Sequence, residues 1–207
     1  MMNQNPNSTA LPPSHNTRGK ARWKLFAILG VCAAPLLLSY FTYYVIQPKS
    51  RTNYGDLIDP RSHPMPVLTT QSLEGKPEAL QNLKGKWLMV QVDASACSLA
   101  CERKLFDMRQ LRVAQGKEME RIERVWLVTD KALVSPDLQT AIKGTHVWRA
   151  DAMELKTWLP SEVKTSIHDH IYLIDPLGNL MMRFPKDADP NKVKKDITKL
   201  LKASSIG

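Results

Sequence analysis

The sequence predicts one α/β domain, built on a central mixed sheet with helices on both faces and preceded by a single transmembrane helix. Three observations support this expectation. One long apolar run near the start of the chain carries no charge. The remaining sequence alternates short apolar strand patterns with helical patterns, and it closes with a strand–turn–strand pattern and an amphipathic helix. Alternation of this kind is typical of domains in which helices cover a partly parallel sheet.

The apolar run extends over residues 25–46 and has 22 residues without a charge, whereas a membrane helix needs about 20. Tyr40, Tyr43 and Tyr44 cluster near its end, where amphipathic rings lie among lipid headgroups. The alternative is a cleaved signal peptide, whose apolar region spans only about 7–15 residues and ends in a small-residue cleavage site. No Ala-x-Ala pattern follows Tyr40. We therefore expect an uncleaved anchor.

The charge distribution indicates the topology. The formal net charge is +9, and the first 52 residues hold six Lys or Arg and no acidic residue, so the rest carries a net charge of only +3. A nucleic-acid-binding protein would carry this excess on its folded domain, so we expect no nucleic-acid partner. Four basic residues precede the span within seven positions, and the positive-inside rule then places residues 1–24 in the cytoplasm.

The composition divides the chain into four parts. Residues 1–24 are expected to form a disordered cytoplasmic tail, because the first 17 are polar and include three prolines. Residues 25–46 form the transmembrane helix. Residues 47–66 contain four prolines and predict an extended linker. Residues 67–207 then form the folded domain.

The order of elements in this domain predicts its fold. Strands are expected at 87–92, 124–129, 146–149, 170–175 and 180–184, and helices at 99–115, 136–142, 152–158 and from Pro190 onward. Gly116 is expected to end the first of these helices, and Asp189 to cap the last, with Pro190 at its first position. A β-α-β unit followed by a β-β-α unit gives the thioredoxin fold.

Cys97 and Cys101 lie where the first expected strand gives way to the first helix. A helix N-terminus favours an anion, so a thiolate there has a lowered pKa, and Arg103 and Lys104 add positive charge. The alternative is a purely structural disulfide, but a bridge across three residues constrains the unfolded chain little. We therefore expect a functional pair. The third cysteine, Cys32, is expected to fill space within the membrane span.

The spacing of the pair leaves two chemistries open. A C-x-x-C pair after a strand is a redox motif, and here the two cysteines have three residues between them. A looser pair suits linear or trigonal coordination of Cu(I), which prefers soft sulfur ligands, and a trigonal site would need a third ligand. His168 and His170, at the start of the HIYLID strand, are the candidate third ligands. Either one has an alternative interpretation as an ordinary loop histidine.

At this point residues 67–202 resemble the Sco/SenC family, membrane-anchored proteins that handle copper during assembly of cytochrome c oxidase. The motifs that carry the resemblance are the LKGKW sequence at 83–87, Cys97-x-x-x-Cys101, the VWLVTD sequence at 125–130 and the IYLIDPLG sequence at 171–178. Ser98 and Glu102 stand where the family usually has proline, and a gapless match places Ile167 where the family has its ligand histidine. The chain resembles a diverged branch of the family.

The resemblance implies a membrane-anchored copper-binding assembly factor for cytochrome c oxidase, with one copper ion per domain. Its ligands would be Cys97, Cys101 and His168, with His170 as the alternative third ligand. It implies an oxidase subunit or its assembly factors as partners, and a location in the bacterial inner membrane with the C-terminal domain in the periplasm. The alternatives are a thiol–disulfide reductase that uses Cys97 and Cys101 as a redox pair on the oxidase's copper-site cysteines, and a non-catalytic interaction module. Whether the protein is an enzyme therefore stays open.

Overall fold

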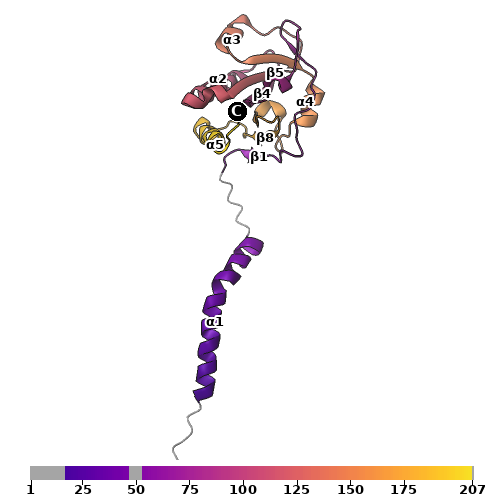
Figure 1. Cartoon of the computed structure of the whole chain (residues 1–207). Helices are drawn as coiled ribbons and strands as arrows, with labels where there is room; N and C mark the ends of the chain where they lie inside the picture. The colour runs from indigo at the N-terminus through magenta and orange to yellow at the C-terminus, as the bar shows by residue number, and fades with distance from the viewer. Residues whose placement is uncertain (1–16, 47–52, 207) are drawn as a thin grey trace, which may run out of the picture. The chain divides into compact units, whose positions relative to one another are not determined.

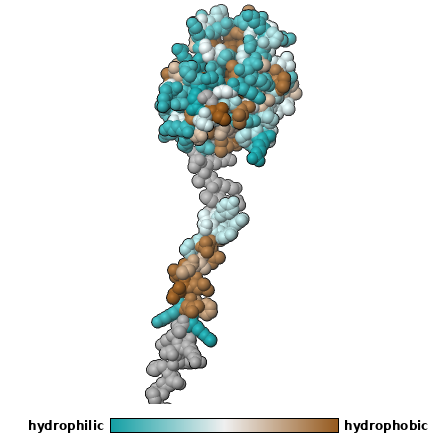
Figure 2. Space-filling model, in the orientation of Figure 1, coloured by the Kyte–Doolittle hydropathy of each residue, from teal (hydrophilic) through white to brown (hydrophobic). Residues whose placement is uncertain are grey.

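The computed structural model describes residues 17–46 and 53–206, which belong to two separate compact units divided between Arg51 and Thr52. The first contains helix α1 (Thr17–Phe41), which continues as a π-helix, η1 (Thr42–Ile46) (Figure 1). Residues Arg22–Tyr44 are long and apolar enough to span a membrane, and none of this window is buried against protein. Figure 2 shows the apolar side chains along it. The predicted apolar helix is therefore confirmed as a candidate membrane span.

The helix begins earlier than the sequence predicts, because residues 17–24 of the expected tail already form its first turns. The rest of that tail, residues 1–16, lies outside the described residues, as do residues 47–52 of the expected linker.

The second unit is built on one mixed sheet of eight strands in the order β1-β8-β7-β4-β5-β6-β2-β3. The strands are β1 (Asp56–Leu57), β2 (Thr70–Ser72), β3 (Pro77–Glu78), β4 (Trp87–Asp93), β5 (Ile122–Val128), β6 (His146–Ala150), β7 (Ile171–Ile174) and β8 (Leu180–Arg183). The central strand β4 pairs parallel with β5 and antiparallel with β7. Six of its seven residues are buried, as expected for a strand covered on both faces.

Helices cover both faces of the sheet (Figure 1). They are α2 (Leu99–Val113), α3 (Pro136–Ala141), α4 (Ala152–Trp158) and α5 (Pro190–Ala203), with short 3₁₀ turns η2 (Leu80–Leu83), η3 (Gly116–Arg121) and η4 (Ile167–Asp169). One core cluster joins α2 and α5 to one face through Met108, Leu111, Val193 and Ile197. The second cluster, on the other face, includes Leu155 and Trp158 of α4. The α/β thioredoxin-like architecture predicted from the sequence is confirmed.

A third core cluster lies beside the start of α2. It contains Cys97, Cys101 and Leu105 together with Trp126 and Val128 of β5 and Ile142 after α3. The cysteines are therefore part of the packed interior and lie against β5 of the sheet.

The element boundaries follow from local sequence chemistry. Gly116 has φ +59 where α2 has ended, a conformation that glycine adopts without strain. Asp189 caps α5, accepting a hydrogen bond from the Asn191 backbone N–H, and Pro190 occupies the first position. The apolar stripe of α5 faces the core as predicted, since Val193, Ile197 and Leu201 are buried.

The folded domain begins before residue 67, which corrects the predicted linker boundary. The backbone N–H groups of Tyr54 and Gly55 donate to the Asp196 carboxylate at 2.7 and 2.9 Å, an arrangement that we call the Asp196 clamp. Strand β1 then pairs with β8, and Arg183 lies 2.9 Å from Asp56. A Cβ atom on Gly55 would lie 2.6 Å from the Met182 sulfur, so only glycine fits there. Residues 54–57 therefore belong to the folded domain, and Asp56 and Leu57 belong to its sheet.

Candidate functional site

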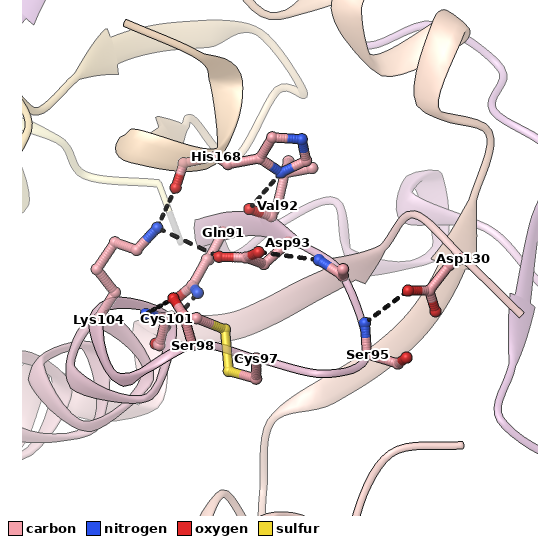
Figure 3. Close-up of a disulfide and its surroundings, with 11 residues drawn as sticks. Gln91, Val92, Asp93, Ser95, Cys97, Ser98, Cys101, Lys104, Asp130 and His168 are labelled. Carbon is pink, nitrogen blue, oxygen red and sulfur yellow. Dashed lines mark hydrogen bonds and ion pairs between the residues drawn. A yellow bond between two sulfur atoms is a disulfide. The ribbon is translucent and has the colours of Figure 1, made fainter. Parts of the chain in front are cut away.

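The two cysteines singled out by the sequence are joined in a disulfide, with their Cα atoms 5.2 Å apart. Strand β4 ends at Asp93, and helix α2 begins at Leu99, so residues 94–98 connect sheet to helix. Residues 94–101, which are this connection together with the first turn of α2, are here called the cysteine loop. Ser98 is the N-cap of α2 and accepts a hydrogen bond from the Cys101 N–H at 3.4 Å. The predicted position of the pair at a helix start is therefore observed (Figure 3).

The two sulfur-bearing residues differ in exposure. Cys97 is 6% exposed and adopts φ +32, a left-handed conformation that is rare for a residue with a side chain. Cys101 is 0% exposed and lies inside the first turn of α2. Both cysteines are therefore buried, and Cys97 is the more exposed of the two.

The cysteine loop is held from the sheet side. The Ser95 N–H donates to the Asp130 carboxylate at 3.1 Å, and the Thr129 N–H donates to the Asp93 carbonyl at 3.1 Å. Hydrogen bonding from Ser95 holds the pKa of Asp130 below its usual value. Asp130, which ends the VWLVTD motif, therefore acts here as a support for the loop rather than as part of the sulfur chemistry.

Gln91 lies directly under the cysteine loop. Its side-chain Nε2 donates to the Cys101 carbonyl oxygen at 3.2 Å, and the residue is 0% exposed (Figure 3). The sequence analysis did not select it. A single amide within the apolar WLMVQV strand was the available signal, because a buried polar side chain in a central strand needs a hydrogen-bonding reason to be there.

Lys104 lies on α2, three residues beyond Cys101. Its ammonium lies 3.7 Å from the Asp93 carboxylate and donates to the His168 carbonyl oxygen. Burial lowers the pKa of Lys104, although Asp93 and Asp169 oppose the shift. Lys104, Asp93 and His168 also line a cleft of about 420 Å³ that reaches Pro190 at the start of α5.

His168 and His170 occupy different environments. The Nδ1 atom of His168 lies 3.3 Å from the Val92 carbonyl, so Nδ1 carries the hydrogen of this bond, and the tautomer with its hydrogen there has its lone pair on Nε2. Figure 3 shows this ring across the end of β4 from the disulfide. His170 is 0% exposed, and its Nδ1 and Nε2 bond the Phe184 carbonyl at 2.9 Å and the Thr165 hydroxyl at 2.7 Å. Its partners therefore make His170 a core residue.

The residues present do not form a copper site in this state of the protein. Within residues 17–46 and 53–206, no three His, Cys, Asp or Glu side chains gather closely enough to hold a metal ion. A disulfide also offers no thiolate, which is the form of cysteine that binds metals. Copper binding would require reduction of the pair and a movement that brings a third ligand to it.

Comparison with known proteins places the chain in a family. The family model described as "transmembrane-like, thioredoxin-like, C-terminal domain" matches residues 87–204. The chain belongs to this family. No curated protein matches the sequence.

Solved structures with the same fold include Sco proteins and thiol:disulfide interchange proteins. A SCO1/SenC family lipoprotein from Bacillus anthracis str. Ames is 18% identical, with a TM-score of 0.52 over 72% of this chain and 98% of that one. Yeast Sco1 with copper bound is 17% identical, with a TM-score of 0.52 over 69% and 94%. A thiol:disulfide interchange protein from Bacteroides sp. is 18% identical, with a TM-score of 0.51 over 69% and 91%. At these identities the likeness establishes the thioredoxin-like fold.

Proposed function

We propose that this protein is a membrane-anchored thiol–disulfide exchange protein that acts through Cys97 and Cys101. The observation that carries the proposal is the bonded pair at the start of α2, in which Cys97 is 6% exposed and Cys101 is fully enclosed. Such an exchange needs an attacking cysteine, for which the more exposed Cys97 is the better candidate, and a resolving cysteine beside it.

The reaction follows from this arrangement. In the dithiol form, the Cys97 thiolate attacks a disulfide of the partner, a mixed disulfide forms, and one partner sulfur leaves as a thiolate. Cys101 then attacks the Cys97 sulfur, the second partner sulfur leaves, and two electrons have passed to the partner. A dithiol reductant in the same compartment would return the Cys97–Cys101 disulfide to the dithiol form.

The surroundings favour the thiolate that begins this sequence. The cysteine loop leads into the N-terminus of α2, whose unpaired N–H groups stabilise negative charge. This effect increases the fraction of Cys97 that can attack at neutral pH.

The test is capture of mixed disulfides on the full-length protein in detergent, with Cys32→Ser in every sample to remove the remaining thiol. Cys101→Ser should accumulate mixed disulfides with a peptide disulfide, because no resolving thiol remains. Cys97→Ser is the matched control and should accumulate none, because Cys101 is enclosed. Equal trapping by both variants, or none by either, would contradict the proposal.

A second candidate is copper handling in cytochrome c oxidase assembly, with copper as cargo held by reduced Cys97 and Cys101 and by His168. The C-x-x-x-C spacing and the lone pair on His168 Nε2 support it, as does the shared fold with copper-bound yeast Sco1. On this proposal the partner is an oxidase subunit or one of its assembly factors. His170 is the weaker choice of ligand, because both of its ring nitrogens already have partners.

Anaerobic Cu(I) titration of the reduced full-length protein separates the two candidates. Copper handling requires one tight equivalent that Cys97→Ser abolishes and His168→Ala weakens, with His170→Ala as the matched control for loss of a nearby histidine. Absence of tight binding in the reduced wild type would reject the copper candidate and leave thiol exchange.

The proposed location is the bacterial inner membrane, with residues 1–24 in the cytoplasm and the thioredoxin-like domain in the periplasm. The basic residues before the span support this orientation, and a periplasmic domain permits disulfide formation. Protease digestion of spheroplasts should remove the domain while leaving the membrane span, whereas full protection of the domain would reverse the topology.

A further inference from the structure

Strand β4 carries one uncharged polar residue in an otherwise apolar run, and that residue is Gln91. It is wholly buried in the central strand of the sheet. Burying an amide is unfavourable unless its polar atoms are hydrogen-bonded. An amide at this position therefore needs a compensating interaction.

Only half of the amide has a partner. Nε2 donates to the Cys101 carbonyl, whereas Oε1 is buried without a hydrogen bond to any described residue. Gln91 and Trp126 are direct register partners on β4 and β5, so their side chains project from the same face of the sheet. The Trp126 indole nitrogen is likewise buried and unpaired among the described residues. The disulfide form thus leaves one acceptor and one donor unused in the layer beneath the cysteines.

Reduction changes what the cysteines offer to this layer. A disulfide sulfur has no hydrogen to donate, whereas the Cys101 thiol gains an S–H donor. The Gln91 amide already contacts Cys101, because its Nε2 donates to the Cys101 carbonyl oxygen at 3.2 Å (Figure 3). The carbonyl oxygen of Gln91 can therefore gain a partner in the dithiol form that it lacks in the disulfide form.

We propose that Gln91 is a positioning residue that favours the dithiol form of the pair by accepting a hydrogen bond from the reduced Cys101 thiol. The inference rests on the proposed thiol–disulfide function and assigns the control of its redox balance to a residue outside the cysteine motif. In the reaction with glutathione, two glutathione thiols supply two electrons and two protons. The Cys97–Cys101 bond breaks, two protein thiols form, and glutathione disulfide leaves.

The test measures the equilibrium constant of this reaction for the full-length protein in detergent, with Cys32→Ser throughout. Gln91→Met keeps the length and approximate volume of the side chain and removes the acceptor. The loss of one hydrogen bond should lower the constant for reduction about three- to tenfold. A tenfold change corresponds to about 30 mV in the reduction potential of a two-electron couple.

Met89→Leu is the matched control, because Met89 lies two residues earlier on the same strand and face and is equally buried. It should leave the constant unchanged. If Gln91→Met does not fold, Gln91→Asn replaces it, since the shorter amide withdraws the carbonyl oxygen from Cys101 and should shift the constant in the same direction.

The outcomes distinguish the inference from the function on which it rests. A wild-type pair that equilibrates with glutathione, together with an unchanged constant in the folded Gln91 variant, overturns the role of Gln91 alone. A wild-type pair that never exchanges with glutathione overturns the proposed function itself. A lowered constant in the Gln91 variant, with Met89→Leu at the wild-type value, supports the inference.

Discussion

Asp196 and Gln91 are both buried polar residues, and they differ in how completely their polar atoms are paired. In the Asp196 clamp, a carboxylate that is 2% exposed accepts two backbone hydrogen bonds, and Lys199 lies 3.7 Å from it. Beneath the cysteine loop, an equally buried amide uses its donor and leaves its acceptor unpaired. The Asp196 carboxylate is fully paired, whereas Gln91 on β4 has a buried acceptor that bonds no described residue.

The difference separates stability from reactivity within one domain. A fully paired buried carboxylate should contribute mainly to the free energy of unfolding, because removing it leaves two N–H groups unsatisfied. A half-paired amide beside a redox pair should contribute mainly to the balance between disulfide and dithiol. Substitutions in the two regions should therefore give different results in the same two assays, urea unfolding and thiol exchange.

The largest effect is expected for Asp196→Ala. Loss of the carboxylate should lower the free energy of unfolding by about 3 kcal/mol, because two hydrogen bonds to a charged group are lost in the interior. Urea unfolding followed by tryptophan fluorescence measures this change. The exchange rate with a peptide disulfide should stay at the wild-type value.

Lys199→Ala is the control, since it removes a mostly exposed ion-pair partner and should cost less than about 1 kcal/mol. Equal destabilisation by the two substitutions would show that the carboxylate acts through the ion pair and not through Tyr54 and Gly55.

An intermediate effect is expected for Ser98→Ala at the cysteine loop. Loss of the N-cap hydrogen bond should destabilise the protein by about 1 kcal/mol. The Cys101 N–H then has no side-chain acceptor at residue 98, so the start of α2 should become less ordered. The rate of thiol–disulfide exchange at Cys97 should change as a result. Hydrogen exchange of the first turn of α2 measures the local effect. Full protection of that turn would contradict the assigned cap.

The smallest effect is expected in the pH dependence of stability, to which His170 contributes and the cysteine loop does not. Burial lowers the pKa of His170 from its usual 6.5, although the Phe184 carbonyl opposes the shift, and Arg183, Glu162 and Asp169 also act on it. The unfolded chain therefore binds a proton more readily than the folded one. This contribution to stability is complete above about pH 6.5 and is lost as the pH falls through the folded-state pKa.

His170→Asn should reduce the pH dependence of the free energy of unfolding just below neutrality. Urea unfolding of the variant and of the wild type across that pH range measures the difference. His168→Asn is the control, because His168 is only partly buried. A wild-type slope in the His170 variant would assign the pH dependence to carboxylates instead.

The sequence predicts the centre of this protein well and its edges poorly. Strands β4, β5 and β7 are apolar runs, and α5 has a clear apolar stripe after an Asp-Pro start signal, so these patterns identify each of them. Strands β1, β2 and β3 have two or three residues with mixed exposure, which gives no period to detect. The Asp196 clamp joins residues 141 and 142 positions apart, and no local pattern announces such a contact.

The candidate site shows the same division. The position of Cys97 and Cys101 at a helix start follows from the strand and helix patterns around them. The sequence does not separate His168 from His170, because two positions in a short segment do not reveal which ring points into the core. Gln91 stands out in the sequence as the one uncharged polar residue of β4. Its role can be inferred only from the structure, in which its side chain bonds the Cys101 carbonyl.

The pairing of β1 with β8 also bears on how the domain would behave if its N-terminal segment were lost. Residues 56 and 57 cover the backbone of β8, which would otherwise be the outer strand of the sheet. Proteolysis between Leu57 and Val67 would release this cover and present unpaired N–H and C=O groups to solvent. Exposed strand edges of this kind promote association between chains. A trimmed domain is therefore expected to aggregate, and soluble preparations should retain the chain from Asn53 onward.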